Sequence, residues 1–471
     1  MNESVYRQAC AYLDEHREAL AEDLMRLVRI PSVSVPGDRN APFGENCLRV
    51  LQETLSMGQE RGFVAEIYDN QVGKLALKPG EVDVGFWGHL DVVPEGGNWE
   101  HSPFDPVIEQ GYVIGRGASD NKGAVVGLLY VLSCLQALGL PLKKNYALYL
   151  GTDEERGMAD VEHFVKYFDP PKMSIVTDCG FPVCYAEKGI IDARLVSVAP
   201  FTSNVVELSG GLASNVVPDS ASMTILKTEK ALSGLAALPA EVEAQVEERV
   251  IRLTAKGVCG HTAFPQNAVN AIRVLTDAVL KAELLPEQDL NILHFLNKVN
   301  DDVYGTTLHI LFEDEISGRL TCVGSTLCLR DRHADLGINI RYPVKERDER
   351  LTDSIATACA QHGFVMDLER VSAPNHFPLN HPAVQKLTEL YNQETGQDSK
   401  PYAMAGGTYA RKLPNAFAYG PGFPGGELPK ELFSPGHGGA HGPDEALDLD
   451  RLLRALKIYI KAILLLDEME L

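Results

Sequence analysis

A mostly apolar run that ends in a histidine and an aspartate places the strongest constraint on the fold. Residues 82–94 read VDVGFWGHLDVVP, and the polar side chains His89 and Asp91 follow a stretch of apolar residues and glycine. A short apolar run of this kind is typical of a strand buried on both faces, as in parallel sheets that helices cover on both sides. The segments 145–151 (NYALYLG) and 173–180 (MSIVTDCG) have the same character. We therefore expect a mostly parallel, doubly wound α/β sheet.

Helical periodicity surrounds these strands and completes the α/β pattern. The spacing of apolar residues predicts helices over 5–29, 44–61, 123–139, 159–167, 382–395 and 445–466, and strands over 63–68 and 73–77. Residues 123–142 carry no charge and could just span a bilayer. Gly139 and Pro141 end that run early, and it lies between strand-like segments, so a buried helix is the favoured interpretation.

The pattern changes near Glu187 and changes back near residue 380. Between them, short alternating segments indicate antiparallel strands, interrupted by helices that we expect over 239–253, 267–281 and 346–362. The predicted organisation is an α/β domain formed by residues 1–186 and 380–471. An α+β domain, residues 187–379, is inserted into it.

The net charge limits which binding partners the protein can have, and the cysteine content indicates its cellular compartment. Lys and Arg total 43 against 65 Asp and Glu, which gives a net charge of −22. Nucleic acid and anionic membrane surfaces are excluded as main partners, because phosphate binding needs a basic face. The nine cysteines are odd in number and show no CxxC spacing, and the first residues contain no apolar core of a signal peptide. We expect a cytoplasmic protein with free thiols.

Polar side chains gather where the predicted strands end. Because ligands bind outside the carboxyl ends of parallel strands, we expect these side chains to converge on one crevice. Crowded carboxylates repel one another, and two divalent metal ions would remove that repulsion. A single Asp or His in such a position is usually a helix cap or an ordinary polar contact, so the inference depends on the whole set. Its members are His89, Asp91, Asp120, Glu154, Glu155 and Asp178, with His441 ahead of the last helix.

The motifs around these residues resemble those of metallopeptidases of the aminoacylase and carnosinase type, and within that group the bacterial dipeptidases. The resemblance extends through most of the chain, and the order of the motifs makes it specific. The matching segments are IPSVS at 30–34, GHLDVVP at 88–94, PFDP at 103–106, GRGASDNKG at 115–123, TDEE at 152–155, TDCGFPV at 177–183, EKG at 187–189, SNVVPD at 214–219, GHTAFP at 260–265, NIRYP at 339–343, GGTYAR at 406–411 and AHGPDE at 440–445.

The resemblance implies a role for each metal-site residue. One ion, zinc or alternatively manganese or cobalt, would be held by His89, Asp120 and Asp178. A second ion would be held by Asp120, Glu155 and His441, so that Asp120 bridges the two. Glu154 would be the general base, Asp91 would support His89, and the Asp120–Asn121 peptide bond would be cis. The substrate would be bound by a further set of residues, Asn215, His261, Arg341, Gly407, Thr408 and Arg411.

The function that this resemblance implies is hydrolysis of dipeptides by a dinuclear metallopeptidase. The α/β domain (1–186 and 380–471) would be the catalytic domain, and the inserted α+β domain (187–379) would be its lid. The partner would be a small peptide, and the protein would be a monomer because this long lid replaces a second subunit. Two alternatives stay open at this point. One is an N-acyl amino-acid deacylase or desuccinylase on the same scaffold, and the other is a metal-binding or peptide-binding protein without catalysis.

Overall fold

The computed structural model describes residues 3–426 and 428–470 of the chain. The chain forms two compact units. Unit 1 contains residues 1–185, 376–402 and 408–471, and unit 2 contains residues 186–375 and 403–407. The boundaries of the units lie within a few residues of the predicted domain boundaries. The structure adds one segment that was not predicted, because residues 403–407 belong to unit 2. The roles of catalytic domain and lid stay predictions.

Unit 1 is built on a sheet whose centre is parallel. The strands follow the order β1-β2-β6-β3-β7-β24-β9-β22. Strand β3 pairs in parallel with β6 and β7, and β7 pairs in parallel with β24. Antiparallel pairs lie toward the flanks, at β1–β2, β2–β6 and β24–β9. The strands are β1 (Val64–Tyr68), β2 (Val72–Ala76), β3 (Val84–His89), β6 (Tyr146–Gly151), β7 (Met173–Val176), β9 (Val183–Glu187), β22 (Asn375–His376) and β24 (Ala416–Tyr419).

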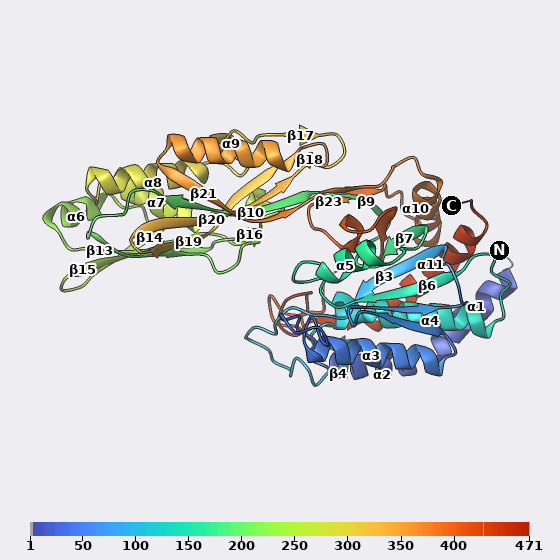
Figure 1. The fold of residues 1–471 in the computed structure, drawn as a ribbon. Coiled ribbons are helices and arrows are strands. Elements are labelled where there is room, and N and C mark those ends of the chain that lie inside the picture. The colour runs from blue at the N-terminus through green and yellow to red at the C-terminus, as the bar shows by residue number, and fades with distance from the viewer. Residues whose placement is uncertain (1–2, 427, 471) are drawn as a thin grey trace. The chain divides into compact units, whose positions relative to one another are not determined.

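Helices cover both faces of this sheet, which confirms the doubly wound α/β prediction (Figure 1). On one face the Phe164 ring of α5 packs against Trp87 and Tyr149. On the other face the Phe86 ring meets Tyr459 of α11, beside the uncharged helix α4. The helices of unit 1 are α1 (Glu3–Glu15), α2 (Arg17–Val28), α3 (Glu45–Glu60), α4 (Gly123–Ala137), α5 (Ala159–Tyr167), α10 (Pro382–Thr395) and α11 (Leu449–Asp467).

Shorter elements complete unit 1. Strands β26, β5 and β4 form a small antiparallel sheet, and β8 pairs with β25. These elements are β4 (Val107–Glu109), β5 (Tyr112–Ile114), η1 (Ala118–Lys122), β8 (Cys179–Gly180), η5 (Tyr409–Arg411), β25 (Pro421–Gly422) and β26 (Ala446–Asp448). Strand β23 (Tyr402–Met404) pairs with β9 and crosses from unit 1 into unit 2 after Tyr402.

The predicted N-terminal helix over 5–29 is wrong as a single element. The structure has two helices, α1 and α2, separated at His16. The His16 ring hydrogen-bonds the Tyr12 carbonyl at 2.7 Å, and a side chain that competes for a helical carbonyl favours a break at that position. The last helix also starts later than predicted, at Leu449, where Asp448 accepts hydrogen bonds from the first free backbone N–H groups.

Unit 2 consists of an antiparallel sheet and a layer of helices. Its strand order is β14-β15-β13-β11-β19-β20-β10-β21. Figure 1 shows α7, α8 and α9 on the same side of this sheet. The sheet strands are β10 (Gly189–Ser197), β11 (Val205–Gly210), β13 (Ser220–Leu226), β14 (Val242–Val246), β15 (Val250–Lys256), β19 (Thr321–Arg330), β20 (His333–Tyr342) and β21 (Phe364–Ser372). The other elements are β12 (Val216–Val217), α6 (Glu229–Gly234), η2 (Leu235–Ala237), β16 (Gly260–His261), η3 (Pro265–Asn267), α7 (Ala271–Lys281), α8 (Glu287–Val299), η4 (Thr306–Leu308), β17 (Glu313–Asp314), β18 (Gly318–Arg319) and α9 (Asp348–Gln361).

The helix predicted over 239–253 is wrong. This segment instead forms the antiparallel pair β14–β15. Its glutamates favour a helix by propensity, but Ile251, Leu253 and Ala255 alternate with more exposed residues and are fully buried. The period of two decides the outcome, because it places all three apolar side chains on the core face of a strand. Helix α8 was not predicted.

Two further expectations concern the membrane and the cysteines. None of the described helices is both long enough and apolar enough to cross a bilayer. Helix α4, the uncharged segment, is buried along almost its whole length, as predicted. Within the described residues no two of the nine cysteines form a disulfide.

The contact between α4 and α11 gives a prediction about stability. Leu456 is fully buried and packs over Gly127, where an added Cβ would come within 2.7 Å of its side chain. Leu456→Ala should lower the free energy of unfolding by about 2–5 kcal/mol, because the cavity cannot refill. Both tryptophans, Trp87 and Trp99, belong to unit 1, so urea unfolding followed by tryptophan fluorescence reports on this unit. Leu379→Ala, at a side chain that is 42% exposed, is the control. Equal effects of the two substitutions would contradict the prediction.

Candidate metal centre

Three parallel strands deliver the candidate residues to one edge of the unit 1 sheet. In the register of the sheet, His89 at the end of β3 lies opposite Gly151 at the end of β6, and Trp87 lies opposite Val176 at the end of β7. The segments that follow β6 and β7 carry Glu154, Glu155 and Asp178. The carboxyl ends of parallel strands meet at one edge, so these side chains converge as the sequence predicts.

The carboxylate of Asp120 lies at the centre of the cluster. Its Oδ1 is 3.0 Å from Nε2 of His89, and its Oδ2 is 3.1 Å from Nε2 of His441. Asp120 lies in η1, where its peptide bond to Asn121 is cis, in agreement with the resemblance. One carboxylate therefore faces a different histidine with each oxygen, which is the arrangement of a ligand shared between two ions.

The remaining carboxylates lie on the two sides of Asp120. Asp178 Oδ2 is 3.8 Å from Nε2 of His89, and Glu155 Oε1 is 3.0 Å from Nε2 of His441. Donor atoms of His89, Glu154 and Asp178 lie within 4.8 Å of one another, and so do those of His89, Asp120 and Glu155. The His89 side chain is 1% exposed whereas that of His441 is 48% exposed, so the cluster opens on the His441 side.

Asp91 supports both the histidine and the two glutamates. Its carboxylate accepts hydrogen bonds from the backbone N–H groups of Glu154 at 3.1 Å and Glu155 at 3.0 Å. Its Oδ1 is 3.4 Å from Nδ1 of His89, whose ring also hydrogen-bonds the Asp91 carbonyl at 3.0 Å. Asp91 is fully buried. A carboxylate in this position fixes the orientation of a ligand histidine and makes it more basic.

Asn121 is a residue of the cluster that the sequence analysis did not assign. Its side-chain amide donates to Asp178 Oδ1 at 3.0 Å, and its Oδ1 accepts from the backbone N–H of His89 at 3.3 Å. The approach requires Gly88, because a Cβ there would lie 2.6 Å from Asn121 Oδ1. The signal was available in the sequence, since Asn121 directly follows the predicted bridging residue.

Burial and mutual repulsion perturb the acids of the cluster. Burial raises the pKa of Glu154 well above that of an ordinary carboxyl group, and the neighbouring Asp178 and Glu155 add to the shift. Burial, with the charge of Asp120, raises the pKa of Asp178 to about 7. For Asp120 itself burial acts in the same direction, but hydrogen bonds from both histidines outweigh it and lower its pKa.

The pKa values of both histidines are also raised, but by hydrogen bonds to carboxylates. Burial alone would lower the pKa of His89, but its hydrogen bonds to Asp120 and Asp91 raise it well above the ordinary value. Hydrogen bonds to Asp120 and Glu155 raise the pKa of His441 to about 10. These shifts describe a site that favours positive charge at its centre.

The donor set fits divalent metal ions. Imidazole nitrogen and carboxylate oxygen are the ligands of catalytic zinc, and they also suit manganese and cobalt. The cationic partners seen at Asp120, Glu155 and Asp178 are His89 and His441. A histidine must be neutral to bind a metal, so in a loaded site the ions would supply the compensating charge instead.

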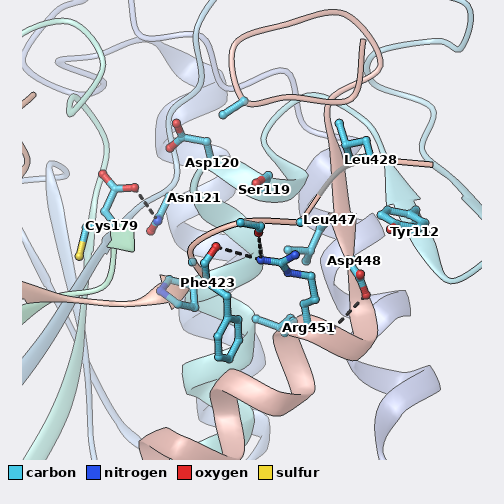
Figure 2. Close-up of a pocket in the computed structure, with 18 residues that line it drawn as sticks. Tyr112, Ser119, Asp120, Asn121, Cys179, Phe423, Leu428, Leu447, Asp448 and Arg451 are labelled. Carbon is cyan, nitrogen blue, oxygen red and sulfur yellow. Dashed lines mark hydrogen bonds between the residues drawn. The ribbon is translucent and has the colours of Figure 1, made fainter. Parts of the chain in front are cut away.

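A pocket of about 450 Å³ opens beside Asp120 and Asp178 (Figure 2). Its apolar side chains include Phe423, Leu428 and Leu447. In Figure 2 Asp120 and Asn121 lie on one side of it and Arg451 on another, where Nη2 of Arg451 donates to two backbone carbonyls of the loop after β25. The volume falls within the range of roughly 300–1,000 Å³ that is usual for small-molecule sites.

Three of the predicted substrate residues gather within unit 2. Strand β12 pairs with β16, and the backbone N–H of Thr262 donates to the carbonyl of Asn215, so Asn215 lies beside His261. The Thr262 hydroxyl donates to Asn339 Oδ1, and the same oxygen accepts from Nε of Arg341 at 3.0 Å. Arg341 is buried on β20. Residues that are distant in the sequence thus form one polar group.

The GGTYAR segment is divided between the two units. Gly407 belongs to unit 2, whereas Thr408 and Arg411 belong to unit 1. Thr408 caps η5 through a hydrogen bond from the Ala410 N–H. Near the AHGPDE segment, the His437 ring pairs with the carboxylate of Asp444. Glu100, His437 and Asp444 form a third group of metal-capable atoms, which the sequence analysis did not propose as a site.

Comparison with known proteins places this geometry in a family. Residues 85–465 match the model of Peptidase family M20/M25/M40. The chain is 34% identical to "Putative dipeptidase YtjP" of Bacillus subtilis (strain 168), over 95% of this chain and 97% of that protein. It is also similar in structure to the di-peptidase Dug1p of Saccharomyces cerevisiae (TM-score 0.60, 14% identity, all of both chains). Human carnosine dipeptidase 1 gives the same TM-score of 0.60 at 14% identity, over 99% of both chains. At 14% identity, the similarity to these two solved structures shows a shared fold only.

The cluster predicts that divalent metal ions stabilise unit 1. Adding Zn²⁺ or Mn²⁺ to chelator-treated protein should raise its melting temperature, because only the folded state brings the ligands together. At a free metal concentration of 100 times Kd, one bound ion raises the free energy of unfolding by about 2.7 kcal/mol. Asp120→Ala should abolish the shift, and Asp398→Ala, at an exposed aspartate of the same unit, should keep it. A shift of equal size in the Asp120→Ala variant, measured by tryptophan fluorescence, would contradict the assignment of this cluster.

Proposed function

Because this chain belongs to peptidase family M20/M25/M40, and is therefore a peptide-bond hydrolase, we propose that it is a dipeptidase dependent on two divalent metal ions. Its substrates would be short unblocked peptides, mainly dipeptides, which it would split into two amino acids. The observation that carries the proposal is the carboxylate of Asp120, which faces His89 with one oxygen and His441 with the other.

The proposed ligand sets follow the two sides of that carboxylate. His89, Asp120 and Asp178 would hold one ion, and Asp120, Glu155 and His441 would hold the other. The distances from each histidine to its carboxylates support this division. Zinc is the favoured metal, with manganese or cobalt as alternatives. When bound, such ions polarise a scissile carbonyl and lower the pKa of water.

Glu154 would accept the proton of the attacking water and pass it to the leaving amine. Its position among the donor atoms of His89 and Asp178 supports this role, as does its raised pKa, which is caused mainly by burial. Asp91 would act through other residues, because it holds the backbone of Glu154 and Glu155 and the ring of His89.

The substrate would be small. The pocket of about 450 Å³ beside Asp120 has the size of a small-molecule site, which supports a short substrate. The polar group of unit 2 is proposed to contact substrate as well, with Arg341 on its carboxylate and Asn215 and His261 as further contacts. A planar guanidinium can bind a carboxylate through two parallel hydrogen bonds. Gly407, Thr408 and Arg411 are proposed as further substrate contacts.

We also propose that the protein acts as a monomer in the cytoplasm. The large inserted unit would supply Asn215 and His261 from the same chain, so that no second subunit is needed. The nine cysteines without a disulfide among the described residues support a reducing compartment.

Glu154→Gln should separate proton transfer from metal binding. Loss of a general base lowers kcat by roughly 10²–10⁴-fold. The metal content, measured by elemental analysis, should stay at the wild-type value, because Glu154 is not a proposed ligand. Glu60→Gln, at an exposed glutamate at the end of α3, is the matched control and should keep full activity. If Glu154→Gln retained wild-type kcat, another residue would have to be the base.

Comparing the free acid and the amide of one dipeptide tests the role of Arg341. A hydrogen bond to a charged group contributes about 1.5–3 kcal/mol, and about 1.4 kcal/mol corresponds to a factor of ten. Arg341→Ala should therefore lower kcat/KM for the free acid by one to two powers of ten. It should hardly change the already low value for the amide, which lacks the carboxylate.

Two further variants make this comparison specific. Arg249→Ala, at an exposed arginine of unit 2, should leave both substrates unaffected, and Arg341→Lys should recover part of the rate with the free acid. The ratio of the two substrates within each variant corrects for any loss of folded protein. Equal cleavage of acid and amide by the wild type, or faster cleavage of N-acylated amino acids, would refute the dipeptidase assignment.

A further inference from the structure

A fully buried ion pair in unit 1 joins the two loops that carry the central ligands. Nη1 of Arg116 donates to Oε2 of Glu445 at 2.7 Å, and both side chains are 1% exposed. Arg116 precedes Asp120 by four residues, and Glu445 follows His441 by four residues. The pair therefore connects segments more than 300 residues apart in the sequence, each of which contains a proposed metal ligand.

Glu445 reaches across to the backbone of the Asp120 loop. Its Oε1 accepts the N–H groups of Ser119 at 3.0 Å and Asp120 at 2.9 Å, and its Oε2 also accepts the N–H of Gly117 at 3.1 Å. Ser119 and Asp120 line the pocket of Figure 2. Because the Glu445 carboxylate binds the backbone of Ser119 and Asp120, it fixes the position of the Asp120 backbone and so the origin of the proposed bridging side chain.

Arg116 reaches in the opposite direction, to the backbone of the His441 loop. Its Nη2 donates to the carbonyl of His441 at 3.3 Å and to the carbonyl of Glu95 at 3.1 Å. The guanidinium lies 5.0 Å from the ring centre of Trp99, in a cation–π contact. The planar fork of the arginine therefore holds Glu445 with one nitrogen and the backbone of the ligand His441 with the other.

We propose that Arg116 and Glu445 are positioning residues that act as a reciprocal clamp, in which each fixes the backbone of the metal ligand carried by the other's loop. The proposal rests on the proposed function. Asp120 and His441 share only one of the two proposed ions, so the clamp should act on that ion most strongly. Contacts behind metal ligands commonly change metal affinity by about 10–100-fold.

A purely structural role is the alternative, in which the pair only joins two loops. Removing one partner of any buried ion pair destabilises a protein, because an uncompensated charge stays inside. Stability alone therefore does not distinguish the two roles. Metal affinity does, because a clamp that sets the separation of Asp120 and His441 must change it, and a simple link between loops need not.

The experiment is a zinc titration of metal-free protein against a competing chelator dye. Glu445→Gln keeps the shape of the side chain but places an NH₂ group against either Arg116 or the N–H groups of the Asp120 loop. Arg116→Lys keeps the charge but lacks the fork, so one ammonium cannot hold both Glu445 and the His441 carbonyl in the same geometry. We expect the affinity for one ion to fall 10–100-fold in both variants, and the affinity for the other ion to change much less.

Asp467→Asn is the matched control. Asp467 is also a buried carboxylate that accepts two backbone N–H groups, from Lys143 and Lys144, each at 3.0 Å. Asp467 lies at the end of α11, and its substitution by Asn replaces a carboxylate with an amide, as Glu445→Gln does. We expect Asp467→Asn to lower the melting temperature while both zinc affinities stay within twofold of the wild type.

The outcomes separate this proposal from the proposed function. If the wild type binds two ions and hydrolyses dipeptides, but folded Glu445→Gln and Arg116→Lys bind both ions with wild-type affinity, the clamp is wrong and the proposed function stands. If Glu445→Gln does not fold, Glu445→Asp and Arg116→Lys decide the question by the same titration. Wild-type protein that binds no zinc overturns the proposed function and the clamp together.

Discussion

The contact of one carboxylate with two histidines is the interaction on which the rest of unit 1 depends. Asp120 lies 3.0 Å from His89 and 3.1 Å from His441, residues that are more than 300 positions apart in the sequence. Several further acids crowd the same place, and burial, together with the charges of neighbouring acids, raises the pKa values of Glu154 and Asp178. A fold can keep such a cluster only if rigid elements hold its members and a cation compensates them.

The parallel centre of the sheet supplies most of that rigidity. Strands β3, β6 and β7 are buried along their length and end at the same edge, so they direct their polar residues to one place. Hydrogen bonds then fix the segments beyond the strands. Asp91 holds the turn after β6, and Asn121 joins the end of β3 to Asp178. The proposed ligand His441 comes from a glycine-rich loop, and there the buried pair of Arg116 and Glu445 provides a cross-link to the Asp120 loop.

The sequence predicts this site better than it predicts the chain around it. The candidate residues could be selected because apolar strands that end in His or Asp indicate both a sheet edge and a metal-binding chemistry, and because each proposed ligand lies in a motif that resembles those of a known family. Asn121, Arg116 and Glu445 were quoted within those motifs but received no role. Their function depends on which backbone groups they meet, and spacing along the chain does not show that.

The errors in secondary structure have similar causes. Over 239–253 a glutamate-rich composition favours a helix, but the alternation of Ile251, Leu253 and Ala255 places them on the core face of β15. At the N-terminus the periodicity continues through His16, and only the bond from its ring to the Tyr12 carbonyl marks the break. In the first segment tertiary packing outweighs helix propensity, and in the second a single side-chain hydrogen bond does. Propensity summed over many residues shows neither effect.

The central claim is that hydrolysis needs both ions, with Asp120 between them. It is tested most directly by adding zinc stepwise to metal-free protein and measuring bound metal and cleavage of one free dipeptide in the same samples. The account predicts little hydrolysis with the first equivalent and a rise to full activity as the second equivalent binds. Full activity with one ion per chain, or in protein that elemental analysis shows to be free of metal, would contradict it.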